Sequence, residues 1–168
     1  MYCRDQTQRI REEAFSLLYF SLHSLVLSYQ TTYLSSHSLV FSCLRTLKPK
    51  FKLVIISNID EDLFAFSAKH LEVEFDRIIT AEQAKSYKPS LNNFRLAMEK
   101  INLSPEEILH VAASIYHDII AAKSLGLSTV WVNRRAGQQG VGATVSAVSQ
   151  PDLEVPDLKT LVALSLGK

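Results

Sequence analysis

The stretch FKLVIISNID, residues 51–60, constrains the fold of this chain more than any other feature. Phe51 to Ser57 is a continuous apolar run rich in β-branched residues, which is typical of a strand buried on both faces of a sheet. The run ends abruptly in Ser57-Asn58, and farther along a loop places Lys88 directly before Pro89. This order predicts an α/β domain with polar side chains at the carboxyl edge of a parallel sheet.

Strand-like and helix-like segments alternate between residues 45 and 132, and such alternation predicts βαβ units. Ser104-Pro105 indicates an N-cap that opens a short turn. Residues 136–150 are rich in Gly, Ala and Ser and predict a loop. The predicted strands are Phe51–Ser57, Arg77–Thr80, Ile108–Ala112 and Ser128–Val132, and the predicted helices are Asp60–Leu71, Leu91–Ile101, Ile115–Leu125 and Leu158–Leu166.

Composition narrows the class of protein. The chain has 168 residues, enough for one domain, and its 47% hydrophobic content allows a real core. Eighteen Lys and Arg against 17 Asp and Glu give a net charge of +1, so nothing in the charge favours a nucleic-acid partner. Cys3 and Cys43 lack metal-ligand spacing, and a disulfide between them stays open. The default expectation is a reduced, cytoplasmic protein.

The first quarter of the chain differs from the rest. Ala14 to Leu44 contains no charged residue and mixes Leu, Phe and Val with many serines. It is long enough to span a bilayer, but its polar residues make membrane attachment the less favoured reading. Glu12 and Glu13 also argue against a signal peptide. We therefore divide the chain into an atypical low-charge, Ser/Leu-rich segment, 1–44, and an α/β core, 45–168.

Five polar residues follow predicted strands: Ser57, Asn58, Lys88, Ser114 and Asp118. In an open parallel sheet these positions converge on one crevice. Hydroxyl, amide, ammonium and carboxylate groups together can bind an anionic substrate and position a nucleophile. Simpler structural roles stay open for each, since Ser114 can be a helix N-cap and Asp118 an acid favoured by the helix dipole.

Three blocks of sequence resemble the haloacid dehalogenase superfamily and, within it, the fungal type II 2-haloacid dehalogenase-like proteins. They are VIISN (54–58), SYKPS (86–90) and ILHVAASIYHDIIAAKSLGLSTVWVNR (108–134). The resemblance covers residues 45–135 and implies a Rossmann-like core for the segment 45–168. It also implies hydrolytic removal of halide from 2-haloalkanoic acids, which are small anionic organic acids.

The resemblance implies a role for each candidate residue. In the family an aspartate attacks the substrate carbon and forms an ester, which water then hydrolyses. Lys88 and Asp118 take catalytic roles: the lysine keeps the nucleophile ionised, and Asp118 pairs with it or places the water. Ser57, Asn58 and Ser114 take substrate-binding roles. Phe94 stands where such dehalogenases often have a tyrosine.

Metal dependence differs between branches of the superfamily. Its phosphatases carry an acid five residues before the second acid, and the pair helps to bind Mg²⁺, which prefers several oxygen ligands. Ala113 occupies that first position, and only Asp118 remains. We therefore expect no metal and no cofactor, with a phosphatase as the alternative.

The family's nucleophile is not found in this sequence. Before Ser57 the only aspartate is Asp5, and no apolar strand precedes it. The expected fold is thus a parallel-sheet α/β core that is missing its first, central strand and its cap domain. Either an apolar part of 14–44, such as Leu17 to Leu27 or Ser38 to Ser42, fills the central position, or the chain is truncated and folds poorly. We expect impaired activity, with a non-catalytic binding protein as a further alternative and a homodimer left open.

Overall fold

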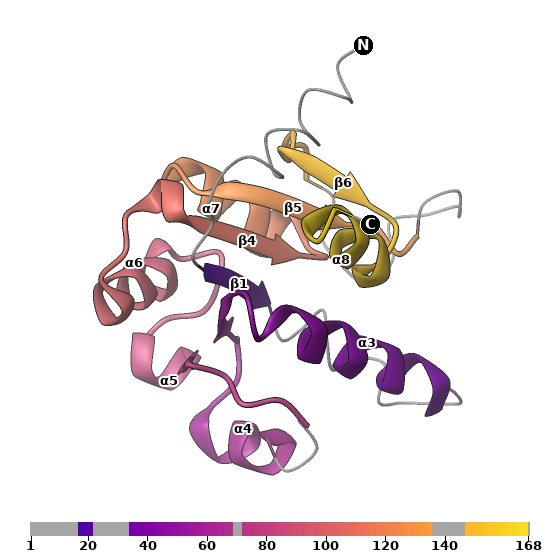
Figure 1. Cartoon of the computed structure of the whole chain (residues 1–168). Helices are drawn as coiled ribbons and strands as arrows, with labels where there is room; N and C mark the ends of the chain where they lie inside the picture. Colours follow the sequence, from indigo (N-terminus) through magenta and orange to yellow (C-terminus); the bar gives the residue numbers. More distant parts are fainter. Residues whose placement is uncertain (1–16, 22–33, 69–71, 136–146, 168) are drawn as a thin grey trace.

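A six-stranded parallel sheet forms the centre of the computed structural model, which describes residues 17–21, 34–68, 72–135 and 147–167 (Figure 1). The strand order is β3-β2-β1-β4-β5-β6, and every neighbouring pair is parallel. The predicted α/β class is therefore confirmed. The strands are β1 (Leu17–Ser21), β2 (Lys52–Ile56), β3 (Arg77–Ile79), β4 (Ile108–Ala112), β5 (Ser128–Val132) and β6 (Leu153–Val155).

Helices connect the strands close to the predicted positions. Parts of two predictions, residues 69–71 of a helix and 136–146 of a loop, lie outside the described residues. The short turn predicted at Pro105 is a 3₁₀ turn, Pro105–Glu107. The helices are α3 (Leu34–Leu47), α4 (Glu61–Ala68), α5 (Ala81–Ala84), α6 (Leu91–Ile101), α7 (Ile120–Ser124) and α8 (Leu158–Ser165), with a π-helical turn, Ile115–Ile119, directly before α7.

Strand β1 occupies the central position of the sheet, so the expectation of a missing central strand is corrected there. Leu18 pairs with Leu53 of β2 on one side and with Leu109 of β4 on the other. The sequence offered two stretches for this position. The one beginning at Leu17 fills it, whereas Ser38 to Ser42 lies within α3. Both elements come from the N-terminal segment, and α3 runs across residue 44, the proposed boundary.

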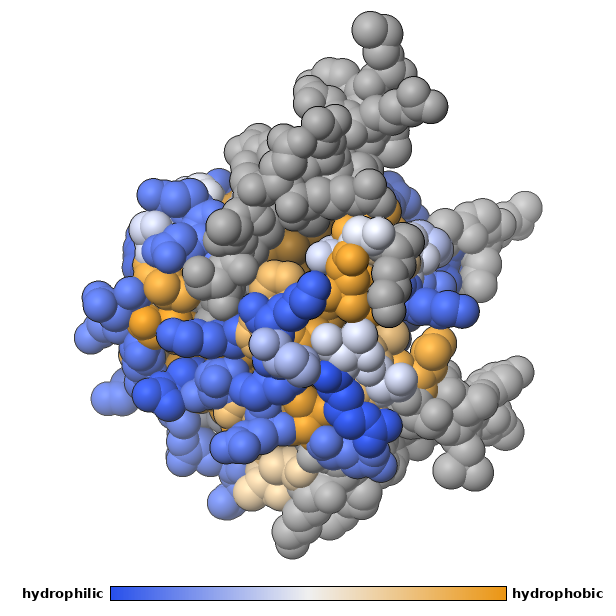
Figure 2. All heavy atoms as spheres, viewed as in Figure 1, coloured by the Kyte–Doolittle hydropathy of each residue, from blue (hydrophilic) through white to orange (hydrophobic). Residues whose placement is uncertain are grey.

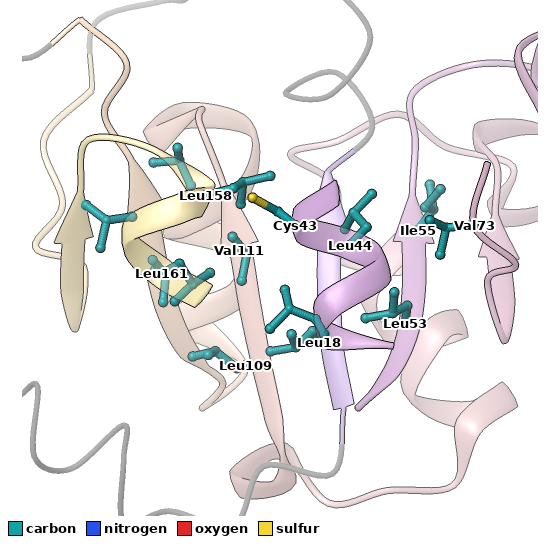
Figure 3. Packing of buried hydrophobic residues seen from close by; sticks show 14 of the residues in the cluster. Leu18, Cys43, Leu44, Leu53, Ile55, Val73, Leu109, Val111, Leu158 and Leu161 are labelled. Carbon is teal, nitrogen blue, oxygen red and sulfur yellow. The ribbon is translucent and has the colours of Figure 1, made fainter. Parts of the chain in front are cut away.

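Alternate residues of the strands face two separate parts of the core. Leu53 and Ile55 pack with Leu44 of α3 and with α8, and Figure 3 shows Leu18, Leu109 and Val111 on this same side. Val54 and Ile56 pack on the opposite side with Phe94 of α6 and with α7. The period of two along each buried strand thus builds three layers, with helices on both faces of the sheet.

The described helices were compared with what is needed to cross a bilayer. None of them combines the length and the apolar character that crossing a membrane needs. In the face shown by Figure 2, hydrophilic side chains cover much of the coloured surface, with smaller apolar patches between them. Cys43 of α3 is a buried free thiol, and Cys3 lies outside the described residues.

The position of Leu18 predicts a large loss of stability when its side chain is shortened. Leu18 is 1% exposed in the middle of the sheet, so Leu18→Ala is expected to lower the free energy of unfolding by about 2–5 kcal/mol. Leu39→Ala is the matched control, because Leu39 of α3 is 46% exposed and its truncation creates no cavity. Urea unfolding measures both changes. Equal stabilities of the two variants would contradict the central placement of β1.

Candidate functional site

Lys88 is a buried lysine at the carboxyl edge of the sheet. It lies in the loop between α5 and α6, and the residue is 3% exposed. Its Nζ donates to Asp118 Oδ1 at 2.7 Å and to the backbone oxygen of Ile56, the last residue of β2, at 3.1 Å. Because an unpaired charge is costly to bury, these contacts are what allow the ammonium group to remain in the interior.

Asn58 fixes the backbone of the lysine loop. Its Oδ1 accepts from the Lys88 N–H at 2.6 Å, and its Nδ2 donates to the Lys88 carbonyl oxygen at 3.1 Å. The amide group therefore bridges the end of β2 to the loop. Sequence reasoning assigned Asn58 to the substrate, but the contacts that the structure shows for it are with Lys88.

Asp118 is the carboxylate of the site. It lies in the π-helical turn that follows β4, and its side chain is 1% exposed. Besides Lys88, His110 Nε2 lies 3.3 Å from the same oxygen, Oδ1. The second oxygen, Oδ2, is buried and has no hydrogen-bond partner in the described part of the chain. Lys88 and Asp118, both predicted from the sequence, are thus brought together as an ion pair.

His110 is the site residue that sequence reasoning missed. It is the third residue of β4, fully buried, with its ring edge-on to Phe94 at a centroid distance of 5.2 Å. One signal was available: a histidine in the middle of the buried run ILHVA needs a polar partner, and an aspartate follows eight residues later. Phe94, at the position where such dehalogenases often have a tyrosine, is fully buried against this ring.

Opposing effects set the ionisation of the pair. Burial by itself raises the pKa of the Asp118 carboxyl group, but the Lys88 ammonium and the hydrogen bonds from His110 and Lys88 outweigh it and hold the pKa well below its ordinary value. Burial lowers the pKa of the His110 imidazole, although Asp118 favours its protonated form. At neutral pH the site therefore combines an ammonium, a carboxylate and a neutral imidazole.

The two predicted serines lie at the same edge with different surroundings. Ser57 is 1% exposed, and its backbone N–H donates to the Ile79 oxygen at the end of β3. Ser114 caps the helix after β4, because its Oγ accepts from the His117 N–H at 3.1 Å and lies 3.0 Å from His117 Nδ1. The alternative role of Ser114 as an N-cap is therefore present in the structure, and substrate binding by either serine stays a prediction.

The donor set does not fit Mg²⁺. That ion prefers six oxygen ligands, and Asp118 is the only carboxylate that the described contacts bring to Lys88. One of its oxygens already accepts from the ammonium, and Ala113, at the position of the second acid, offers no side-chain oxygen. The described residues hold no group of three or more His, Cys, Asp or Glu with metal-binding geometry.

Removal of the Asp118 charge is expected to be strongly destabilising. Asp118→Asn leaves the Lys88 ammonium buried without its counter-ion, so the free energy of unfolding should fall by about 3–5 kcal/mol. Glu72→Gln makes the same chemical change in an exposed pair, with Arg45 at 2.7 Å, and should change stability little. Denaturant unfolding compares the two, and a cost for Asp118→Asn no larger than that for Glu72→Gln would exclude the buried pair.

His110 is expected to make stability depend on pH. Above the ordinary histidine pKa of about 6.5 both folded and unfolded states are neutral, so its contribution is fully present. As pH falls below that value the unfolded state takes up a proton that the folded state, with its lowered pKa, resists; the stability is therefore lost towards acid. His110→Gln should flatten this slope between pH 7 and pH 5 in unfolding measurements. Phe94→Leu, destabilised without loss of a titrating group, should keep it; a wild-type slope in His110→Gln would contradict the assignment.

Sequence comparison places the chain among known hydrolases. The sequence model of the haloacid dehalogenase-like hydrolase family matches residues 13–132. Haloacetate dehalogenase H-2 of Moraxella sp. (strain B) is 30% identical over 125 residues, which cover 72% of this chain and 53% of that protein. (S)-2-haloacid dehalogenase of Pseudomonas sp. (strain YL) is also 30% identical over 125 residues, covering 72% and 51%. The chain thus spans about half the length of the curated relatives it matches.

A phosphatase is also similar, over a shorter stretch. Glyceraldehyde 3-phosphate phosphatase of Pyrococcus furiosus is 33% identical over 57 residues, which cover 34% of this chain and 24% of that protein.

Solved structures share the fold. An L-2-haloacid dehalogenase superposes with a TM-score of 0.65 at 22% identity, covering 88% of this chain and 69% of that one. L-2-haloacid dehalogenase from Xanthobacter autotrophicus, with chloropropionic acid covalently bound, gives 0.62 at 27% identity and covers 75% and 59%. The family match extends over most of the chain, and the superpositions show that the fold is shared. This chain belongs to the haloacid dehalogenase-like hydrolase family.

Proposed function

We propose that the carboxyl edge of this sheet is a 2-haloacid dehalogenase site of the fungal type II kind, with impaired turnover. The observation that carries the proposal is the buried ion pair between Lys88 and Asp118, 2.7 Å apart at the edge where parallel sheets bind ligands. Two relatives that act on haloacetate or 2-haloacids, at 30% identity, support the substrate class. The substrate would be a small anionic organic acid.

The reaction is a displacement followed by a hydrolysis. In the ancestral reaction of the family, an aspartate carboxylate attacks C2 of the 2-haloacid, the carbon–halogen bond breaks, and halide leaves. Water then adds to the ester carbonyl carbon of the aspartate, and the 2-hydroxy acid is released with the enzyme carboxylate restored. In this scheme Lys88 keeps the edge electropositive, Asp118 accepts a hydrogen bond from the water, and Ser57, Asn58 and Ser114 contact the substrate.

The missing attacking group is the reason to expect slow turnover. Residues 14–59 contain neither Asp nor Glu, so β1, with the sequence LLYFS, offers no carboxylate where the family has its nucleophile. The proposal includes a metal-free and cofactor-free reaction in the cytoplasm, and it leaves the oligomeric state open.

Two alternatives have specific support. The similarity to a glyceraldehyde 3-phosphate phosphatase favours a phosphatase, whereas Ala113 and the single carboxylate disfavour the magnesium site that such an enzyme needs. The absence of an acid in β1 favours a non-catalytic protein that binds small anions.

Halide release from 2-chloropropionate tests the proposal. Purified chain should release halide slowly and to the same extent with and without Mg²⁺. Lys88→Ala should lower the rate at least about tenfold, because a fixed charge at the reacting centre is lost. Lys100→Ala removes an exposed lysine of α6 and should leave the rate unchanged.

Each other result points to one alternative. No halide release from a folded sample would reject the dehalogenase and leave the binding protein. Magnesium-dependent phosphate release from a phosphate ester would reject it in favour of the phosphatase.

A further inference from the structure

His110 places a polar ring inside the core beside the candidate site. In the described part of the chain, the ring contacts Phe94 of α6 and Asp118 of the turn after β4. Among the described residues, the charged groups that act on it are Asp118 and Lys88. A polar partner lowers the cost of burying an imidazole, and Asp118 is such a partner for Nε2 of this ring.

The direction of the hydrogen bond to Asp118 can be assigned. An ionised carboxylate only accepts hydrogen bonds, so the His110 nitrogen 3.3 Å from Oδ1 must be the one that carries a proton. His110 is therefore the neutral tautomer with its hydrogen on Nε2, and Nδ1 is an acceptor. The edge of the Phe94 ring packs at an interplanar angle of 69° and restricts rotation of the imidazole.

Both donors of the cluster are directed at one carboxylate oxygen. Lys88 Nζ at 2.7 Å and His110 Nε2 at 3.3 Å share Oδ1, while Oδ2 is buried and has no hydrogen-bond partner among the described residues. A buried carboxylate oxygen without a donor is costly, by about 1–3 kcal/mol or more. Oδ2 can therefore accept a hydrogen bond from a donor other than the described side chains.

We propose that His110 is a positioning residue, which holds Asp118 with Oδ1 on Lys88 and leaves Oδ2 to accept a hydrogen bond from a water molecule. The use of that water in ester hydrolysis rests on the proposed dehalogenase function. The orientation of Asp118 does not rest on it, because it follows from the contacts alone.

Nitrogen-15 NMR of the imidazole and carbon-13 NMR of the Asp118 carboxyl group test the orientation. In wild-type protein at pH 7 the His110 ring should carry its hydrogen on Nε2. His110→Leu removes the donor and should move the Asp118 carboxyl signal, whereas His110→Gln, whose amide can donate from a similar position, should restore it. Leu161→Ala, in the core on the opposite face of the sheet, controls for general loosening and should leave the bond in place.

Two results would overturn the inference. One is a hydrogen on Nδ1 of His110, and the other is an Asp118 signal that is the same in His110→Leu and in wild type. If His110→Leu does not fold, the position of the hydrogen on the wild-type His110 ring still tests the inference. Failure of His110→Gln to keep the wild-type Asp118 signal would then contradict it.

Kinetics separate this inference from the proposed function. If wild-type protein releases halide, His110→Leu should lower kcat more than it changes KM, and His110→Gln should recover most of kcat. Correct NMR signals without any halide release would reject the dehalogenase function and keep the positioning role. An unchanged kcat in a folded His110→Leu variant would reject the role of the water.

Discussion

The buried ion pair between Lys88 and Asp118 is the constraint on which the carboxyl edge depends. Both side chains are about 1% exposed, so each would carry a large desolvation penalty without the other. The contact requires that the loop before α6 and the turn after β4 meet at the end of β2, where Ile56 supplies the third partner. The chemistry of the edge and the packing of three segments are thus coupled through one 2.7 Å contact.

Each partner of the ion pair also has a hydrogen bond with another polar residue. Asn58 holds the lysine side through two hydrogen bonds to the Lys88 backbone, at 2.6 and 3.1 Å. His110 holds the carboxylate side through Oδ1. Supporting contacts of this kind narrow the range of orientations that long side chains can adopt, which is a requirement for any precise site. Neither residue needs to touch a ligand to do so.

The sequence predicted what local periodicity and topology determine. The apolar runs at Leu53 and Leu109 mark buried strands, and parallel strands bring their carboxyl ends to one edge, so Lys88 and Asp118 could be expected to meet. It could not choose between Leu17 to Leu27 and Ser38 to Ser42 for the central strand, because LLYFS has no β-branched residue and stands in a Ser-rich stretch. Its strand state comes from pairing with β2 and β4. Nor could it show that Asn58 serves Lys88, since that contact joins residues thirty positions apart.

The fold and the reaction require different things of strand β1. Its place in the sheet needs backbone hydrogen bonds to β2 and β4 and an apolar side chain such as Leu18 on the α3 and α8 face, and many sequences can supply these. Attack on a substrate carbon needs one carboxylate at one position, which no apolar residue can replace. A sheet can therefore keep its central strand, and the buried pair beside it, whether or not that strand carries an attacking group. In this chain the Lys88 and Asp118 pair is stabilised by its own neighbours, so its presence does not depend on a functioning nucleophile.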